Sequence, residues 1–209
     1  MATARLVAPQ HHAGPICGAD SLFEAVHTKR YAERMTAYLG LGVQSHVIEV
    51  ASSDGSLLQQ FSRLGIPVIG IERDHAAAVR AMKVRGVPTL TGSFGRDMAR
   101  SLAAEGIDAD LMVANNALSR VADIDDFLDG FTLLLNPEGV ATFEVSRTSC
   151  LSTQMAEQLF AASGLRIFDV EPLDTQDGSL QLFACRADAA WQRGPRVGRT
   201  LAMERPVVH

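Results

Sequence analysis

Cysteine is scarce in this chain, and its scarcity excludes two classes of small protein. The 209 residues include three cysteines, Cys17, Cys150 and Cys185, which lie far apart in the sequence. Zinc knuckles and disulfide frameworks need cysteines at short, repeated spacings. We therefore expect no metal site, interpret the thiols as incidental and assign the protein to a reducing cytoplasm.

Long apolar runs and an excess of positive charge are also missing. No hydrophobic stretch approaches the roughly 18 residues that suggest a membrane span, and we expect no signal peptide. The formal net charge is −5 and the sequence pI is about 5.6. Because nucleic-acid-binding proteins concentrate lysine and arginine on one face, we expect neither a nucleic acid nor a membrane as partner.

The chain does contain a regular alternation of short apolar runs and helical patterns, in a length that suits one α/β domain. Strands are predicted over 47–51, 66–71, 87–90, 109–114, 140–145, 165–170 and 179–185. Helices are predicted over 56–64, 75–85, 96–105, 124–135 and 151–163, with a turn at 136–139. Strands separated by helices pair in parallel, whereas the last two are too close for a crossover and should form an antiparallel hairpin.

Both ends of the chain are expected to lie outside this domain. Residues 1–20 are interpreted as an irregular arm, and the domain is expected over 21–187. Its first helix is predicted to begin at Ser21, because Ser21 and Glu24 have the spacing of a capping box. Residues 188–209 are interpreted as a tail that is either flexible or held to the domain or to a partner by Trp191.

The first predicted strand leads into the segment VIEVASSDGSLL, residues 47–58, where a nucleotide-binding protein would have a glycine-rich loop. A dinucleotide site needs G-x-G-x-x-G, so that the pyrophosphate can approach the backbone. Here those places carry Ala51, Ser53 and Ser56. A P-loop is excluded, because G-x-x-x-x-G-K-[ST] does not occur in the chain. The segment therefore indicates a ligand without a pyrophosphate.

The second predicted strand is followed by Glu72, 23 positions after Glu49. A carboxylate at that place typically binds the two hydroxyl groups of a ribose. A ribose without a pyrophosphate fits S-adenosylmethionine, with backbone N–H groups of residues 52–55 at its carboxylate and Glu49 or Asp54 near its ammonium group. The alternative is that Glu49 caps a loop and Glu72 is an ordinary exposed acid.

Longer segments strengthen the cofactor interpretation. VIEVASSDGSLLQQF, residues 47–61, and ADLMVANNALSRVADIDDFLDGF, residues 109–131, resemble the deoxysugar C-methyltransferases, a family of class I S-adenosylmethionine-dependent enzymes. The similarity runs from about Arg30 to Arg186. It implies a Rossmann-like, doubly wound, mostly parallel sheet of seven strands with an antiparallel last strand.

The resemblance also implies a cofactor site. Glu49, Ala51, Ser53, Asp54 and Gly55 would surround the methionine end, Glu72 the ribose, Ser93 and Phe94 the adenine, and Asn115 and Asn116 the sulfonium. We add Ser52, Arg73 and Leu118 to this expected cofactor shell. His27 and Tyr31, on the first helix, are interpreted either as a lid over the cofactor or as a face packed on the domain.

The chain departs from the family where the sugar is handled. The family's zinc segment, base-bearing stretch and C-terminal sugar domain have no counterpart here, and Arg120, Gln176 and Gln181 replace two histidines and an arginine. Glu144, Asn116 and Asp177 remain as candidate catalytic residues. We expect a methyltransferase acting on a small metabolite. A catalytically reduced binding or partner subunit, a non-methylating use of the cofactor, and a homodimer are left open.

Overall fold

The structure, a computed structural model, describes residues 18–146, 153–173 and 178–204. The strands are β1 (Val47–Val50), β2 (Val68–Glu72), β3 (Thr89–Thr91), β4 (Ala109–Asn115), β5 (Leu135–Val145), β6 (Leu165–Pro172) and β7 (Leu180–Arg186). The helices are α1 (Gly18–Leu39), α2 (Ser56–Arg63), α3 (His75–Arg80), the π-helix η1 (Ala81–Arg85), α4 (Arg96–Ala104), α5 (Ile124–Leu134), α6 (Thr153–Ala162) and α7 (Pro195–Glu204).

These strands form one sheet in the order β3-β2-β1-β4-β5-β7-β6. Strand β7 pairs antiparallel with both β5 and β6, and the other neighbours pair in parallel. The predicted seven-stranded, mostly parallel sheet with a reversed last strand is confirmed. The strand order reverses between β1 and β4, and ligands of such sheets bind beyond the carboxyl ends of the strands at this point.

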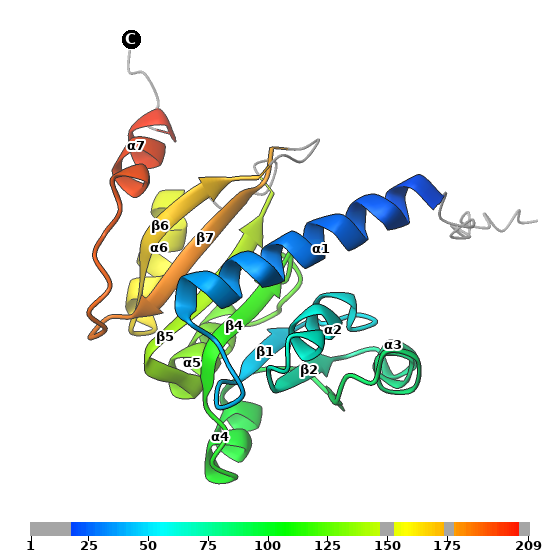
Figure 1. The fold of residues 1–209 in the computed structure, drawn as a ribbon. Helices are drawn as coiled ribbons and strands as arrows, with labels where there is room; N and C mark the ends of the chain where they lie inside the picture. The colour runs from blue at the N-terminus through cyan, green and yellow to red at the C-terminus, as the bar shows by residue number, and fades with distance from the viewer. Residues whose placement is uncertain (1–17, 147–152, 174–177, 205–209) are drawn as a thin grey trace, which may run out of the picture.

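Helices cover both faces of the sheet, because alternate side chains of each buried strand point to opposite faces. On one face, Tyr31 and Met35 of α1 and Phe61 of α2 pack with Val47 and Val113. The opposite face carries α4, α5 and α6. Figure 1 shows α1 running diagonally across its face, with α5 and α6 behind the sheet. No helix in the described ranges is long and apolar enough to cross a membrane.

Three local predictions are corrected by the structure. Helix α1 begins at Gly18, so residues 18–20 do not belong to an irregular arm as expected. The helix predicted over 75–85 changes from α to π geometry at Ala81. The turn predicted at 136–139 is instead the beginning of β5, where the register between β4 and β5 shifts and Asn136 Nδ2 donates to Asp110 Oδ1 at 2.8 Å.

The C-terminal segment is packed rather than free. The Trp191 ring stacks on Phe168 with a centroid distance of 5.1 Å, and its Nε1 donates to the carbonyl oxygen of Glu138 at 2.9 Å. Residues 195–204 then form α7, whose Val197 is fully buried against the core. The segment passes along the edge strand β6, and the Gly194 N–H donates to the Phe168 carbonyl oxygen at 2.7 Å. Covering an edge strand in this way hinders pairing with other chains.

Candidate functional site

The loop between β1 and α2 has several positive φ angles, as a glycine-rich loop does, although Gly55 is its only glycine. Ala51, Ser53 and Gly55 have φ angles of 60°, 51° and 75°. Positive φ is natural for glycine, but it is uncommon and costly for alanine and serine. Such strain persists where surrounding contacts hold it, and it clusters at ligand sites. The loop predicted from sequence as the ligand site therefore has a conformation typical of one.

Glu72, at the end of β2, holds this loop from one side. Its Oε2 accepts the Ser53 N–H and its Oε1 accepts the Asp74 N–H, each at 2.8 Å. A carboxylate has about four acceptor positions, so two remain after these bonds. Glu72 is thus more than an ordinary exposed acid: it positions the loop and keeps free acceptor positions. Its role at a ribose stays a prediction.

Glu49 and Asp54 lie in different electrostatic surroundings. Glu49 is 7% exposed, and its Oε2 has no hydrogen-bond partner in the described part of the chain. Burial, followed by the nearby charges of Asp54 and Glu72, raises the pKa of Glu49 well above its ordinary range. Burial also disfavours ionised Asp54, but hydrogen bonding and charge from Arg85 outweigh it and lower the pKa of that carboxyl. Glu49 is the carboxyl left available for a cation.

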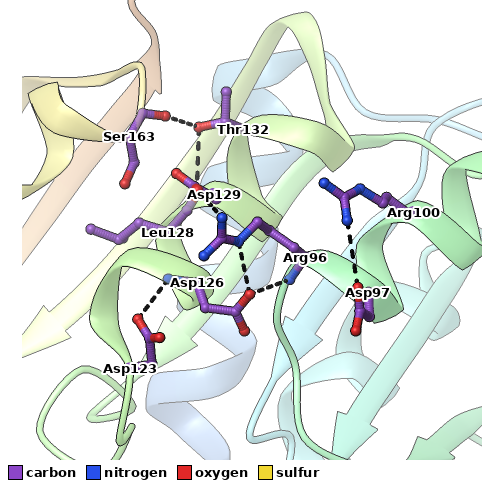
Figure 2. A network of polar contacts seen from close by, with 9 residues as sticks. All are labelled: Arg96, Asp97, Arg100, Asp123, Asp126, Leu128, Asp129, Thr132 and Ser163. Carbon is purple, nitrogen blue, oxygen red and sulfur yellow. Dashed lines mark hydrogen bonds and ion pairs between the residues drawn. The ribbon is translucent and has the colours of Figure 1, made fainter.

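The expected adenine end lies after β3. The Phe94 ring packs edge-on against Phe127 and Phe131, with centroid distances of 5.7 and 5.3 Å. Figure 2 shows what fixes the next turn: Asp126 Oδ1 accepts from the Arg96 N–H at 3.2 Å and from its Nε at 2.9 Å. The loop carrying Ser93 and Phe94 is therefore braced by contacts between α4 and α5.

The end of β4 brings two asparagines to the same edge of the sheet. Asn116 has a φ of 53°, and its N–H donates to the Glu144 carbonyl oxygen at 3.1 Å. Asn115 Oδ1 is buried and finds no hydrogen-bond partner among the described residues. The Leu118 side chain packs in the hydrophobic core. Arg73 is exposed after β2. No contact tests the cofactor roles expected of these residues.

Polar side chains from neighbouring strands form a row at this edge. The sheet register pairs Asn115 with Glu144, Glu144 with Gln181, and Gln181 with Glu171. Gln181 is 2% exposed, and its Nε2 lacks a partner within the ranges described. Glu171 is engaged by Arg34 of α1 at 2.5 Å and by an arginine of α7. We call Asn115, Glu144 and Gln181 the polar row.

Unsatisfied buried polar atoms gather around this site. Buried polar atoms are nearly always hydrogen-bonded, so each exception needs a reason. In the part of the chain that the structure describes, the exceptions are Thr36 Oγ1, Glu49 Oε2, Ser52 Oγ, Asn115 Oδ1 and Gln181 Nε2. Four of these five belong to the carboxyl edge of the sheet, in the loop after β1 or in β1, β4 and β7. A polar ligand at this edge would give them partners.

Tyr31 belongs to the packed face of α1 rather than to a lid. It is 8% exposed, and its hydroxyl lies 2.5 Å from Thr142 Oγ1 of β5. Burial raises the pKa of the Tyr31 phenol, so this hydroxyl stays neutral. His27 is exposed one turn earlier on α1, and its lid role stays a prediction. Asp177 lies outside the described residues.

Sequence reasoning missed two residues that shape the site. Arg85 reaches Asp54 from the end of η1, and Thr142 receives Tyr31 from the middle of β5. Both contacts join residues far apart in sequence, and no local motif marks them. The sequence marks Gln181 only as a departure from a family pattern, whereas the sheet register places it in the polar row.

Comparison with known proteins identifies the family and the fold. A family profile described as a methyltransferase domain matches residues 23–175. A C-methyltransferase from Streptomyces niveus, NovU, is 28% identical over 196 residues, which cover 86% of this chain and 46% of the relative. The chain thus spans about half the length of that relative.

Solved structures share the fold at low sequence identity. A TehB-like S-adenosylmethionine-dependent methyltransferase from Corynebacterium glutamicum has a TM-score of 0.59 and 16% identity, over 77% of this chain and 98% of its own. The glycopeptide N-methyltransferase MtfA, complexed with the cofactor analogue sinefungin, has a TM-score of 0.60 and 12% identity, over 76% and 94%. At these identities the likeness concerns the fold.

Proposed function

The chain belongs to the class I S-adenosylmethionine-dependent methyltransferase family, and we propose that it transfers the methyl group to a small-molecule acceptor bound at the polar row. The observation that carries this proposal is the row itself. Asn115, Glu144 and Gln181 are cross-strand neighbours at the switch-point edge of the sheet, beside the loop after β1. Two of the three carry buried polar atoms that lack a partner within the described ranges.

The residues around the loop fit the cofactor. The unpartnered, buried Oε2 of Glu49 suits the ammonium group of the methionine moiety, and the remaining acceptor capacity of Glu72 suits the ribose hydroxyls. Backbone N–H groups of residues 52–55, next to the beginning of α2, suit its carboxylate. When bound, S-adenosylmethionine supplies an electrophilic methyl group on a positively charged sulfur.

The polar row supplies the groups that can bind and deprotonate a methyl-accepting molecule. Gln181 Nε2 is a hydrogen-bond donor and Asn115 Oδ1 is an acceptor, and both lie in a water-poor part of the molecule. Glu144 lies between them in the register and is partly exposed. We assign Glu144 as the base that receives the proton given up by the nucleophilic atom of the acceptor. The two amides orient that molecule.

A small molecule is favoured over a macromolecule by the way α1 lies on this face. The helix is fixed to the sheet by the Tyr31–Thr142 contact, two residues before Glu144 on β5, and by the Arg34–Glu171 ion pair, where Glu171 pairs with Gln181 in the register. Figure 1 shows α1 lying across this face of the sheet. An acceptor reaching the row must fit beside a packed helix. The net charge of −5 also argues against a phosphate backbone as substrate.

The test is incubation of the purified chain with methyl-labelled S-adenosylmethionine and fractionated metabolite extracts. Label is expected in a small-molecule fraction. The Glu144→Gln variant is expected to lower turnover by about a hundredfold, as loss of a general base does, while S-adenosylhomocysteine binding stays unchanged. Glu105→Gln, a matched change at the exposed end of α4, should leave both unaffected.

Two results would contradict the proposal in different ways. Label in protein or nucleic-acid fractions would overturn the substrate class. Cofactor binding without any labelled product would overturn the activity of the chain alone and favour a partner subunit.

A further inference from the structure

We infer that Arg85 is a positioning residue for the cofactor loop: through Asp54 it holds residues 51–55 in the shape that binds the methionine end of the cofactor. The inference rests on the cofactor placement under the proposed function. It also gives different roles to the two carboxylates predicted near the ammonium group of the cofactor. Asp54 supports the loop, and Glu49 is the ligand of the ammonium group.

The contacts divide the two oxygens of Asp54 between two tasks. Oδ1 accepts the Ser56 N–H at 3.1 Å, at the beginning of α2. Oδ2 accepts from Arg85 Nη2 at 2.6 Å. Gln59 of α2 makes two hydrogen bonds with the same arginine. Its Nε2 donates to the Arg85 carbonyl oxygen and its Oε1 accepts from Arg85 Nη1, both at 3.3 Å. Both carboxylate oxygens of Asp54 therefore accept hydrogen bonds from within the protein.

The π-helix η1 brings Arg85 to this place. Arg85 is the last residue of η1, and because a π-turn has one more residue than an α-turn, Arg85 points in a direction that a continued α-helix would not give it. The turn ends with the Val87 N–H donating to the Ala81 carbonyl oxygen at 3.1 Å. It packs directly on the loop: a Cβ on Gly55 would lie 3.1 Å from Ala81 Cβ and 3.2 Å from Val87 Cβ. Isolated π-turns frequently occur at functional sites.

The loop needs support of this kind because of its backbone. Ala51 and Ser53 have positive φ angles, which persist only where surrounding structure over-determines them. Glu72 holds Ser53 from the side of β2. Arg85 holds Asp54 from the side of η1. The two side chains together fix the loop at adjacent residues, on both sides of the peptide bond that joins Ser53 to Asp54.

The competing arrangement is that Asp54 binds the ammonium group directly. The two make opposite predictions for the loss of Arg85. If Arg85 supports the loop, its loss weakens cofactor binding. If Asp54 is a direct ligand, loss of Arg85 removes a competing cation, and binding stays equal or becomes tighter.

The experiment measures S-adenosylhomocysteine binding by calorimetry at fixed ionic strength. Arg85→Gln and Asp54→Asn are each expected to raise the Kd about fivefold, and the double variant no more than either single one, because the pair acts as a unit. Arg85→Lys should recover part of the affinity. Hydrogen exchange at residues 51–59 should be faster in Arg85→Gln. Arg186→Gln, which breaks an ion pair with Asp188 near the start of β6, is the matched control and should change neither.

Three outcomes would overturn the inference. An unchanged or lower Kd in Arg85→Gln, together with a raised Kd in Asp54→Asn, identifies Asp54 as a direct ligand. Additive effects in the double variant make the two residues independent. If the wild-type chain binds no S-adenosylhomocysteine, the proposed cofactor placement fails first, whereas wild-type binding that Arg85→Gln leaves intact overturns this inference alone.

Discussion

The hydroxyl of Tyr31 lies 2.5 Å from the hydroxyl oxygen of Thr142, and this contact joins α1 to β5 across 111 residues of sequence. Both side chains are buried, at 8% and 0% exposure. The helix before the first strand is therefore part of the core, and it forms a wall of the site rather than a loose cover. Two residues further along β5 on the same face lies Glu144, the proposed base.

Removing the Tyr31 hydroxyl should destabilise the fold. Tyr31→Phe leaves the buried Thr142 hydroxyl without its partner, which costs about 1–2 kcal/mol in the free energy of unfolding. Urea unfolding measures the change. Tyr38→Phe is the matched control, since Tyr38 is half-exposed, and should have no effect. Adding Thr142→Val to Tyr31→Phe should restore part of the loss. Equal midpoints for Tyr31→Phe and wild type would contradict the prediction.

The stability of the protein should depend on pH through Glu49. Its folded pKa is raised above the ordinary value of 4.5, chiefly by burial. The folded state therefore holds the proton more tightly than the unfolded state, and stability falls as pH rises from 4.5 toward the raised pKa. Glu49→Gln has no proton to lose. As pH rises above 4.5, this variant should lose less stability than wild type.

Cofactor affinity should show the opposite trend with pH. An ammonium group binds the ionised carboxylate better, so S-adenosylhomocysteine should bind wild type more tightly as pH rises toward neutrality and displace a proton at lower pH. Glu49→Gln should bind about tenfold more weakly, with little pH dependence. Calorimetry in buffers of different ionisation enthalpy detects the released proton. A Glu49→Gln variant with wild-type affinity would exclude Glu49 as the cation ligand.

Local patterns in the sequence were sufficient for predicting the sheet and for locating the loop of the candidate site. The apolar runs are short and separated by helical segments, and this alternation already determines parallel pairing. The spacing of Glu49 and Glu72 identified the loop, because both follow from the β1–α2–β2 connection. The absence of glycine at 51 and 53 indicated a ligand without a pyrophosphate. It did not reveal the backbone conformation, because Ala51 and Ser53 keep positive φ angles.

Long-range contacts set the features that the sequence did not reveal. Gln181 joins the polar row only because β7 inserts between β5 and β6. Arg85 meets Asp54 only because a helix changes from α to π geometry at Ala81. For residues 188–204, the stacking of Trp191 on Phe168 agrees with the predicted alternative of a tail held to the domain, whereas the helix α7 was not predicted.

The C-terminal segment should contribute measurably to stability. Trp191→Ala removes the stacking on Phe168 and the ring contact with Tyr38 of α1, 5.6 Å between centroids. Because the ring is partly buried, the loss should be about 2 kcal/mol in the free energy of unfolding. Val43→Ala, at a 70% exposed position, is the control and should be neutral. An unchanged unfolding midpoint in Trp191→Ala would show that the segment adds no stability.

Gln181 is expected to lower the free energy of unfolding while supporting turnover. Its buried Nε2 has no partner within the described ranges, and an unsatisfied buried amide costs free energy in the folded state. Gln181→Met keeps the length of the side chain and removes the polar atoms, so the free energy of unfolding should rise by about 1 kcal/mol. If the amide orients the acceptor, turnover of the labelled product should fall about tenfold, while S-adenosylhomocysteine binding stays constant. Gln192→Met, an exposed change in the C-terminal segment, should alter none of these quantities. A stabilised variant with full turnover would remove Gln181 from the acceptor site, and a destabilised one would mean that its amide is satisfied in solution.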